Sequence, residues 1–269
     1  MLATALVPSR LEWLGRVGST NDVVREWLQA GTPEVCVAVA DEQTAGRGRN
    51  GRTWTAPAGA ALLCSLGFRP SWLPPDRAWQ LAAIVALAMA EAAEDVSGLE
   101  TATIRLKWPN DLVIEGEAGV HKVAGVLGET DGLGTPDPRA VIGIGVNAAW
   151  QRADFPPELA ADMTSLTEAS GRADIDRRAL LDAFLGLLEP GVRDLRDGRF
   201  DAAAWADRQL TNGRPVRLEL PDGAIETLLA TGVDGVTGAL QVADRDGRER
   251  QVLVGEIRHL RLDAPRIGV

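Results

Sequence analysis

A loop rich in glycine and arginine, residues 43–52, carries the clearest capacity for chemistry in this chain. Its glycines allow the backbone to approach a ligand closely. Arg47, Arg49 and Arg52 offer forked donors that bind a phosphate or a carboxylate. Trp54 follows directly and provides a flat ring for a purine or an apolar ligand. The loop matches neither the P-loop nor the dinucleotide fingerprint, and alone it also fits a mobile basic surface loop, for example one that binds RNA.

The pentapeptide Lys107-Trp108-Pro109-Asn110-Asp111 is the second candidate. A lysine at the end of a strand, followed by an amide and a carboxylate on a rigid turn, brings three kinds of polar group to one point. The oxygens of Asn110 and Asp111 suit Mg²⁺, which usually binds through a carboxylate together with substrate phosphates. The alternative is an ordinary tight turn.

Lysine is rare in this chain, which has 28 Lys+Arg residues but only two lysines, Lys107 and Lys122. An ammonium group is a compact point charge, whereas a guanidinium is a planar fork, so a retained lysine indicates a position where arginine does not serve. Lys122 begins an apolar run that contains Gly125, a sign of close ligand approach within a strand. The alternative is a chance survivor of arginine-biased usage. The run 143–147 ends in Asn147, which is a weaker candidate for contact with a ribose or phosphate.

Composition excludes several classes of protein. A net charge of −10 argues against general nucleic-acid binding, which needs a basic surface. With two histidines, a histidine-rich metal site is excluded. The N-terminus has no signal-peptide pattern, and the longest apolar run, 81–90, is too short to span a bilayer. Cys36 and Cys64 form no Cys-x-x-Cys pair and are expected to be reduced core thiols of a cytoplasmic protein.

Residue periodicity and turn residues predict alternating strands and helices without a regular βαβ repeat. The pattern favours an α+β fold in which helices pack on a mixed β-sheet. The predicted helices are 23–30, 78–96, 177–188 and 200–209, and the predicted strands are 35–40, 60–68, 103–106, 112–115, 122–129 and 140–146.

The pattern changes after Gly213. Asp-Gly pairs recur every twelve residues, at 222–223, 234–235 and 246–247. Turn signals at this spacing predict a small antiparallel barrel or sandwich. The strands expected between them are 216–220, 226–233, 239–243 and 250–257. We therefore predict two domains, 1–211 and 212–269.

In combination, these segments resemble the biotin protein ligases from about residue 12 to residue 260. The resemblance rests on the order and spacing of Gly18-Ser19-Thr20-Asn21, Gln43 with the loop 46–52, Lys107 to Asp111, Lys122-x-Ala-Gly125 and the run ending in Asn147. It implies a mixed-sheet catalytic domain followed by an SH3-like barrel. It also implies an enzyme that makes biotinyl-5′-AMP from biotin and Mg-ATP and transfers biotin to a lysine of another protein.

The resemblance assigns roles to individual residues. Lys122, Arg47 and Arg49 would be the catalytic cations, with Lys122 neutralising charge at the reacting carboxylate and phosphate. Trp54 would lie against adenine. The residues implied for biotin are Ser19, Thr20, Asn21, Gln43, Gly46, Arg47, Gly48, Arg49, Lys122 and Gly125. Those implied for ATP are Arg49, Arg52, Trp54, Lys107, Asn110, Lys122 and Asn147, and Asn110 and Asp111 are the candidates for Mg²⁺.

The implied partner is the biotin carboxyl carrier domain of an acyl-CoA carboxylase, and the implied assembly is a monomer or a weak homodimer. Some family members begin with a helix-turn-helix, whereas about a dozen residues precede the catalytic region here, so we expect a short form that binds neither DNA nor membranes. The connection 115–121 is longer and more acidic than in the shortest members, which affects the expected loop shape only. A lipoate or octanoate ligase and a non-catalytic biotin sensor are the nearest alternatives. The first would need a triple-glycine loop that this chain lacks, and the second would not need Trp54, Lys122 and Asn147 together.

Overall fold

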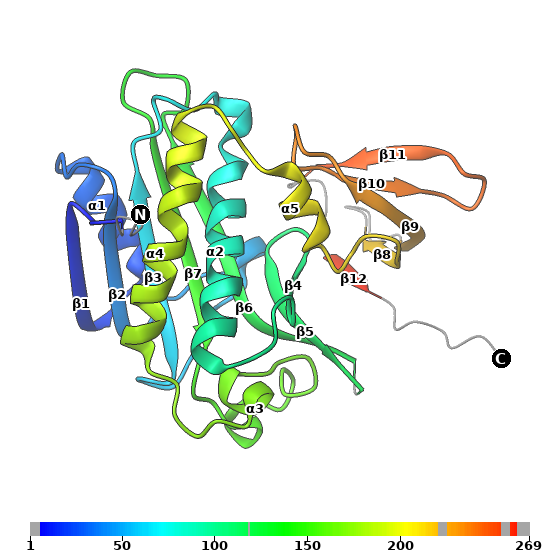
Figure 1. The fold of residues 1–269 in the computed structure, drawn as a ribbon, viewed down its shortest axis with the longest axis horizontal. Helices are drawn as coiled ribbons and strands as arrows, with labels where there is room; N and C mark the ends of the chain where they lie inside the picture. Colours follow the sequence, from blue (N-terminus) through cyan, green and yellow to red (C-terminus); the bar gives the residue numbers. More distant parts are fainter. Residues whose placement is uncertain (1–5, 118, 220–224, 254–258, 263–269) are drawn as a thin grey trace.

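The computed structural model describes residues 6–117, 119–219, 225–253 and 259–262. A seven-stranded sheet with the order β1-β2-β3-β7-β6-β5-β4 forms its larger part (Figure 1). β1 pairs with β2 in parallel and every other neighbouring pair is antiparallel, so the predicted mixed sheet is confirmed. Its strands are β1 (Arg10–Val17), β2 (Cys36–Gln43), β3 (Ala61–Phe68), β4 (Ile104–Lys107), β5 (Asp111–Gly116), β6 (Gly119–Asp131) and β7 (Arg139–Asn147).

β1 was absent from the expected elements. It is an edge strand, and Leu11 is 43% exposed. Glu12 and Arg16 interrupt the apolar pattern, and no strict alternation identifies the strand from the residues alone.

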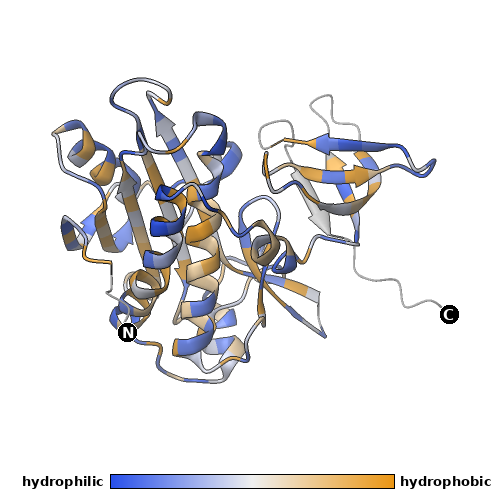
Figure 2. Ribbon diagram, turned by 45° about the horizontal axis from the view of Figure 1, so that its top comes forward, coloured by the Kyte–Doolittle hydropathy of each residue, from blue (hydrophilic) through white to orange (hydrophobic). Residues whose placement is uncertain are grey.

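Helices cover the two faces of the sheet unequally. α2 (Trp79–Ser97) and α4 (Arg177–Arg196) pack side by side on one face (Figure 1). In α2, 13 of the 19 residues are buried, because the helix packs against the sheet on one side and against α4 on another. Figure 2 shows that its residues are largely hydrophobic. The shorter helices are α3 (Leu166–Ser170) and α5 (Ala202–Asp207). The prediction was therefore right about α2, too short for α4 and too long for α5.

α1 (Thr20–Gln29) packs on the opposite face through a separate, smaller core. The strand period of two separates the cores: in β2, Cys36 and Ala38 face α1, whereas Val37 and Val39 face α2 and α4. Cys36 and Cys64 are buried and free, as expected. Because α1 covers only part of this face, the strands beyond it are left to line a cavity.

The C-terminal strands form a second sheet with the order β11-β10-β9-β8-β12. The expectation of a closed barrel is corrected here: in the part of the chain that the structure describes, β11 and β12 lie at opposite edges of an open sheet. Each is four residues long and pairs along its whole length with one neighbour. The strands are β8 (Pro215–Glu219), β9 (Ile225–Val233), β10 (Leu240–Ala243), β11 (Glu249–Val252) and β12 (His259–Leu262). The expected turn at 222–223 and the end of the strand expected at 250–257 lie outside the described residues.

The two sheets are in direct contact. The buried indole of Trp108 donates to the carbonyl oxygen of Gly238 over 2.9 Å, and Arg214 forms an ion pair with Glu115 over 2.5 Å. None of the helices within the described ranges is both long enough and apolar enough to cross a membrane.

Candidate active site

A cavity of about 1130 Å³ lies where the start of α1, the loop after β2, the β4–β5 turn and strands β6 and β7 meet. It collects 14 of the 16 residues proposed from the sequence as ligand-binding or metal-binding, from segments up to about a hundred residues apart. Large concave cavities with a few convergent polar groups are the usual location of ligand sites. These 14 residues are Ser19, Thr20, Asn21, Gln43, Arg47, Gly48, Arg49, Arg52, Trp54, Lys107, Asn110, Asp111, Lys122 and Gly125.

The other two, Gly46 and Asn147, do not line the cavity. A Cβ on Gly46 would lie 2.4 Å from the carbonyl oxygen of Trp54, so the glycine allows the base of the loop to close. Asn147 is 3% exposed, and its amide donates to the carbonyl oxygen of Thr164 over 3.0 Å. In this structure both residues hold backbone segments beside the cavity, and their direct ligand contacts stay predictions.

Glycines form the floor of the cavity. A Cβ on Gly145 would lie 2.5 Å from the ring of Trp54, and one on Gly143 would lie 2.2 Å from Oδ1 of Asn21. A Cβ on Gly125 would be 3.0 Å from Nζ of Lys122. Any side chain at these positions would therefore displace a residue of the site.

A chain of neutral hydrogen bonds lines one end of the cavity. Oε1 of Gln43 accepts from the backbone nitrogen of Thr20 at 2.7 Å and from its hydroxyl at 3.0 Å. The Thr20 hydroxyl lies 2.7 Å from that of Ser65, which in turn donates to Oδ1 of Asn21 over 2.6 Å. These bonds determine which way the Gln43 and Asn21 amides face. The site is thus preorganised for an uncharged polar ligand group. Ser65, fully buried and the only hydroxyl in an apolar strand, was missed from the sequence, although its polarity was a usable signal.

The glycine–arginine loop is a hairpin rather than an irregular segment. Arg47 and Thr53 form a β-bridge, and the backbone nitrogen of Gly48 donates to the carbonyl oxygen of Arg52 over 2.7 Å. A 3₁₀ turn, Arg49–Gly51, forms the tip. The hairpin carries Trp54 onto the glycine floor, where the buried indole nitrogen has no hydrogen-bond partner within the described structure. A buried N–H without a partner is costly, so the position of Trp54 leaves one unsatisfied donor at the floor of the cavity.

Lys122 reaches the cavity because β6 contains a bulge. Leu112 pairs with Ala124 and Val113 pairs with Lys122, so Val123 is an extra residue. Val123 and Ala124 consequently both face the main core, and Lys122 and Gly125, three residues apart, both face the cavity.

The ammonium group of Lys122 is held firmly. Its Nζ lies 2.6 Å from Oδ1 of Asp111 and 5.2 Å from the centre of the Trp54 ring. Its backbone is tied on both sides, donating to Asp162 over 2.8 Å and accepting from Thr164 over 2.9 Å. The segment 158–164 carries these contacts, and several of its residues line the cavity, but it offered no recognisable motif in the sequence.

Asn110 is fixed by β6 and faces the loop. Its amide donates to the carbonyl oxygen of Val126 over 2.8 Å, and its Oδ1 lies 3.5 Å from Nη1 of Arg49. Burial lowers the pKa of Arg49, while the charge of Asp111 acts in the opposite direction. A partly desolvated cation with such a long contact is well placed to bind an incoming anion.

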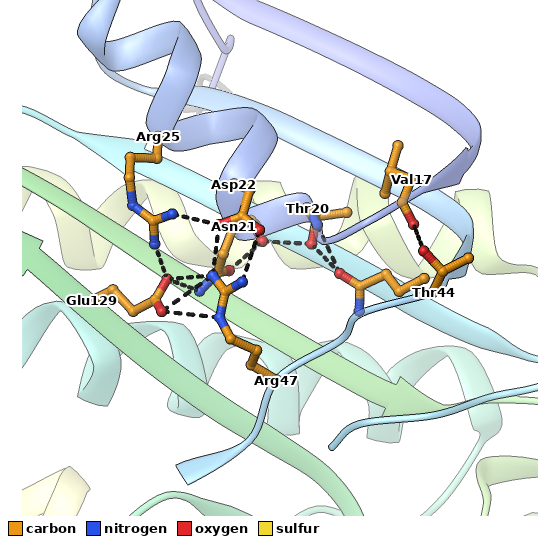
Figure 3. A network of polar contacts seen from close by, with 10 residues as sticks. Val17, Thr20, Asn21, Asp22, Arg25, Thr44, Arg47 and Glu129 are labelled. Atoms are coloured by element: carbon orange, nitrogen blue, oxygen red, sulfur yellow. Dashed lines mark hydrogen bonds and ion pairs between the residues drawn. The ribbon is translucent and has the colours of Figure 1, made fainter. Parts of the chain in front are cut away.

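Arg47 has a different environment, and Figure 3 shows it among carboxylates. Its guanidinium bonds both oxygens of Asp22 at 2.8 Å and lies 3.2–3.3 Å from the oxygens of Glu129. The hydrogen bond to Asp22 is the main reason that the pKa of Arg47 is raised, and the same bond lowers the pKa of Asp22. The loop therefore presents two arginines with different partners, although the sequence treats them alike.

Metal and thiol chemistry have little support in this cavity. Within the described ranges there is no group of three His, Cys, Asp or Glu residues able to hold a metal ion. Asp111 already pairs with Lys122, so the Asn110–Asp111 pair fits a Mg²⁺ that arrives with phosphate oxygens better than a resident ion. Cys64 lines the cavity, but burial raises its pKa to about 12, which leaves the thiol protonated.

Comparison with known proteins adds to this geometry. The sequence profile described as the Biotin/lipoate A/B protein ligase family matches residues 13–147. The chain is 33% identical to the biotin–[acetyl-CoA-carboxylase] ligase of Mycobacterium tuberculosis, across 94% of this chain and 90% of that protein. It is 35% identical to the bifunctional ligase/repressor BirA of Bacillus subtilis, across 91% of this chain and 73% of that protein.

Two solved structures have the same fold. The biotin protein ligase of Aquifex aeolicus in complex with biotin and ATP superposes with a TM-score of 0.76 at 28% identity, covering 94% of this chain and 99% of that one. The biotin protein ligase of Leishmania major in complex with biotinyl-5-AMP gives a TM-score of 0.55 at 27% identity, covering 92% and 100%.

Proposed function

The chain belongs to the biotin/lipoate A/B protein ligase family, and from that premise we propose that it activates biotin with Mg-ATP and transfers it to a lysine of a biotin carboxyl carrier protein. One observation carries the proposal. A single glycine-floored cavity has a neutral polar set at one end, around Asn21 and Gln43, and the cations Lys122 and Arg49 further along. Such a cavity suits a ligand with an uncharged polar head and an anionic tail.

In the first step, a carboxylate oxygen of biotin attacks the α-phosphorus of ATP, and pyrophosphate leaves with the bonding electron pair. Both reactants are anions, so the reaction needs positive charge at the point of attack. Lys122 provides it from a fixed position, because Asp111 and the bulge in β6 hold its ammonium group at the cavity wall. Arg49, whose long contact with Asn110 is easily exchanged, binds the carboxylate or the α-phosphate.

In the second step, the amine of the carrier lysine attacks the acyl carbon of the mixed anhydride. An amide forms, AMP leaves with its electron pair, and the proton lost by the amine passes to solvent. The anhydride is sensitive to water, so the hairpin that carries Arg49 and Trp54 must cover it until the carrier arrives.

The remaining roles follow from position in the cavity. Ser19, Thr20, Asn21 and Gln43 bind the ureido and thiophane head, and Gly125 leaves room for it. The nucleotide lies toward the other predicted ATP-binding residues, with Trp54 against adenine. Mg²⁺ enters as the ATP complex, and Asp111 with the oxygen of Asn110 would hold it. The other predicted ATP-binding residues are Arg52, Trp54, Lys107 and Asn110, which line the cavity, and Asn147, which lies beside it.

We extend the proposal to the organisation of the chain. The boundary lies at 211/212, and the open five-stranded sheet after it corresponds to an SH3-like fold. Two buried free cysteines favour a reducing, cytoplasmic location. The carrier is a separate protein, and the enzyme works as a monomer or weak homodimer.

The test is a reconstituted transfer reaction. The protein is incubated with ATP, Mg²⁺, biotin and a biotin carboxyl carrier domain, and the carrier is probed with streptavidin. A carrier whose acceptor lysine is replaced by arginine is the negative control. Octanoate or lipoate in place of biotin, followed by mass spectrometry, tests the nearest alternative. Labelling of the carrier by octanoate or lipoate but not by biotin would contradict the proposal.

A further inference from the structure

The two arginines that flank Gly48 have unequal partners. Each of the three guanidinium nitrogens of Arg47 donates to Asp22 or Glu129, so an anionic ligand would have to displace two carboxylates to reach it. Arg49, two residues later, lies 3.5 Å from a neutral amide oxygen. Bidentate arginine–carboxylate pairs are among the stronger polar contacts in proteins. The cation predicted to act on the substrate therefore corresponds to Arg49 rather than to the Arg47 side chain.

We propose that Asp22 and Glu129 form a carboxylate clasp that anchors the base of the hairpin through Arg47, which makes Arg47 a positioning residue rather than a catalytic one. The clasp joins the hairpin to α1 through Asp22 and to β6 through Glu129. The hairpin can then open and close beyond Gly48 while its base stays in place.

Charge balance supports a permanent anchor. Arg25 also contacts both carboxylates, Asp22 and Glu129, the latter at 2.6 Å. Two guanidinium groups thus face two carboxylates, and the cluster is neutral overall. The Asp22 and Glu129 side chains are 40% and 28% exposed, so the cluster is shielded in part from solvent. A neutral and satisfied cluster has no excess charge with which to attract a substrate anion.

The backbone divides the hairpin at the same place. Below Gly48, the base is closed by the Trp54–Gly46 hydrogen bond of 2.9 Å and the bridge between Arg47 and Thr53. Above it, the tip turns through Asn50 with φ 56° and Gly51 with φ 72°. The base of the hairpin, which carries Arg47, is therefore anchored, whereas the tip, which carries Arg49, is the part that turns.

Glu129 has a second task that Asp22 does not share. Its Oε2 accepts from Nδ2 of Asn21 over 2.8 Å, whereas Oδ1 of Asn21 accepts from Ser65. Glu129 consequently orients the amide at the polar end of the cavity as well as holding Arg47. Substitution of Asp22 should loosen only the hairpin, whereas substitution of Glu129 should loosen the hairpin and the polar set together. The two variants separate the clasp from general damage to the site.

Limited trypsin digestion of the full-length protein without ligand tests the anchor directly. Cleavage after Arg47, Arg49 and Arg52 is followed by mass spectrometry. In Asp22→Asn and Glu129→Gln, we expect these bonds to be cut at least about fivefold faster, because trypsin acts on the opened hairpin. Glu12→Gln is the matched control: it removes an arginine–carboxylate pair of similar exposure, 42%, on the edge strand β1 and should leave the rate unchanged.

A second measurement rests on the proposed function. Biotinyl-AMP formed in the site should dissociate about tenfold faster from Asp22→Asn, while biotin affinity without ATP changes by less than about twofold. Glu129→Gln should lose biotin affinity as well. If the hairpin of Asp22→Asn is cut no faster than that of Glu12→Gln, the clasp does not exist. The proposal also fails if the hairpin of Asp22→Asn is cut faster but the variant releases biotinyl-AMP at the wild-type rate. Should the wild-type protein form no biotinyl-AMP, the proposed function fails, but the digestion still decides whether the clasp exists.

Discussion

Replacement of Lys122 is the most direct probe of how this cavity works. In Lys122→Ala, the positive charge disappears, and the carboxylate of Asp111 loses the ammonium group that lies 2.6 Å from its Oδ1. That carboxylate then faces an anionic substrate. In Lys122→Arg, the charge remains but its shape changes. Nζ already lies 3.0 Å from the position of a Cβ on Gly125, and the Trp54 ring bounds the other side. A planar guanidinium is longer than an ammonium group and does not fit in the same place.

The size of each effect follows from the geometry. A charge about 4 Å from a phosphate, at an effective dielectric constant of about 20, contributes roughly 4 kcal/mol, which corresponds to about a thousandfold in rate. Lys122 is 23% exposed, so this effective dielectric constant is appropriate. We expect Lys122→Ala to slow adenylation about 10³-fold. Lys122→Arg should lose about 10²-fold, the usual cost of one misplaced donor at a transition state.

The assay is single-turnover formation of biotinyl-AMP, measured by rapid quench and chromatography with biotin and Mg-ATP both saturating. Thermal unfolding of each variant serves as the control, since Lys122 is a partly exposed side chain whose loss should leave the fold intact. An arginine variant within about threefold of the wild-type rate would refute the reasoning, because charge alone would then suffice.

Three further outcomes are expected. Arg49→Gly should release biotinyl-AMP into solution, where it labels lysines of bystander proteins. If mass spectrometry finds only the carrier labelled, Arg49 does not retain the intermediate. Gly143→Ala places a Cβ 2.2 Å from Oδ1 of Asn21 and should weaken biotin binding about tenfold or more in calorimetry. Unchanged affinity would show that Asn21 does not bind biotin. Arg208→Ala leaves the buried carboxylate of Glu94 without its ion pair, so it should lower the free energy of unfolding by about 3 kcal/mol in urea titration. A loss below about 1 kcal/mol would contradict the interpretation that this ion pair is buried.

Local residue patterns were sufficient for much of the architecture and for part of the candidate site, whereas Ser19, Thr20, Asn21 and Gln43 were assigned through the resemblance to the biotin protein ligases. The apolar runs of α2 and β3 have lengths and periods that identify them, and Gly and Pro mark their ends. The glycine–arginine loop and the turn 107–111 were recognised because residue type and spacing within a few positions define them. Such features depend on neighbours along the chain, so the amino-acid order contains them directly.

Other features needed the folded chain, because they depend on pairing between distant segments. Lys122 and Gly125 would face opposite sides of a regular strand, and they meet in the cavity only through the bulge that the register with β5 creates. Likewise, nothing near Arg47 indicates that its partners are Asp22, 25 residues earlier, and Glu129, 82 residues later. Sheet order and register bring those carboxylates to the loop, and they depend on the packing of the whole sheet rather than on any short segment. For that reason the sequence could propose which residues gather at the site, whereas the division of labour between Arg47 and Arg49 came from the tertiary structure.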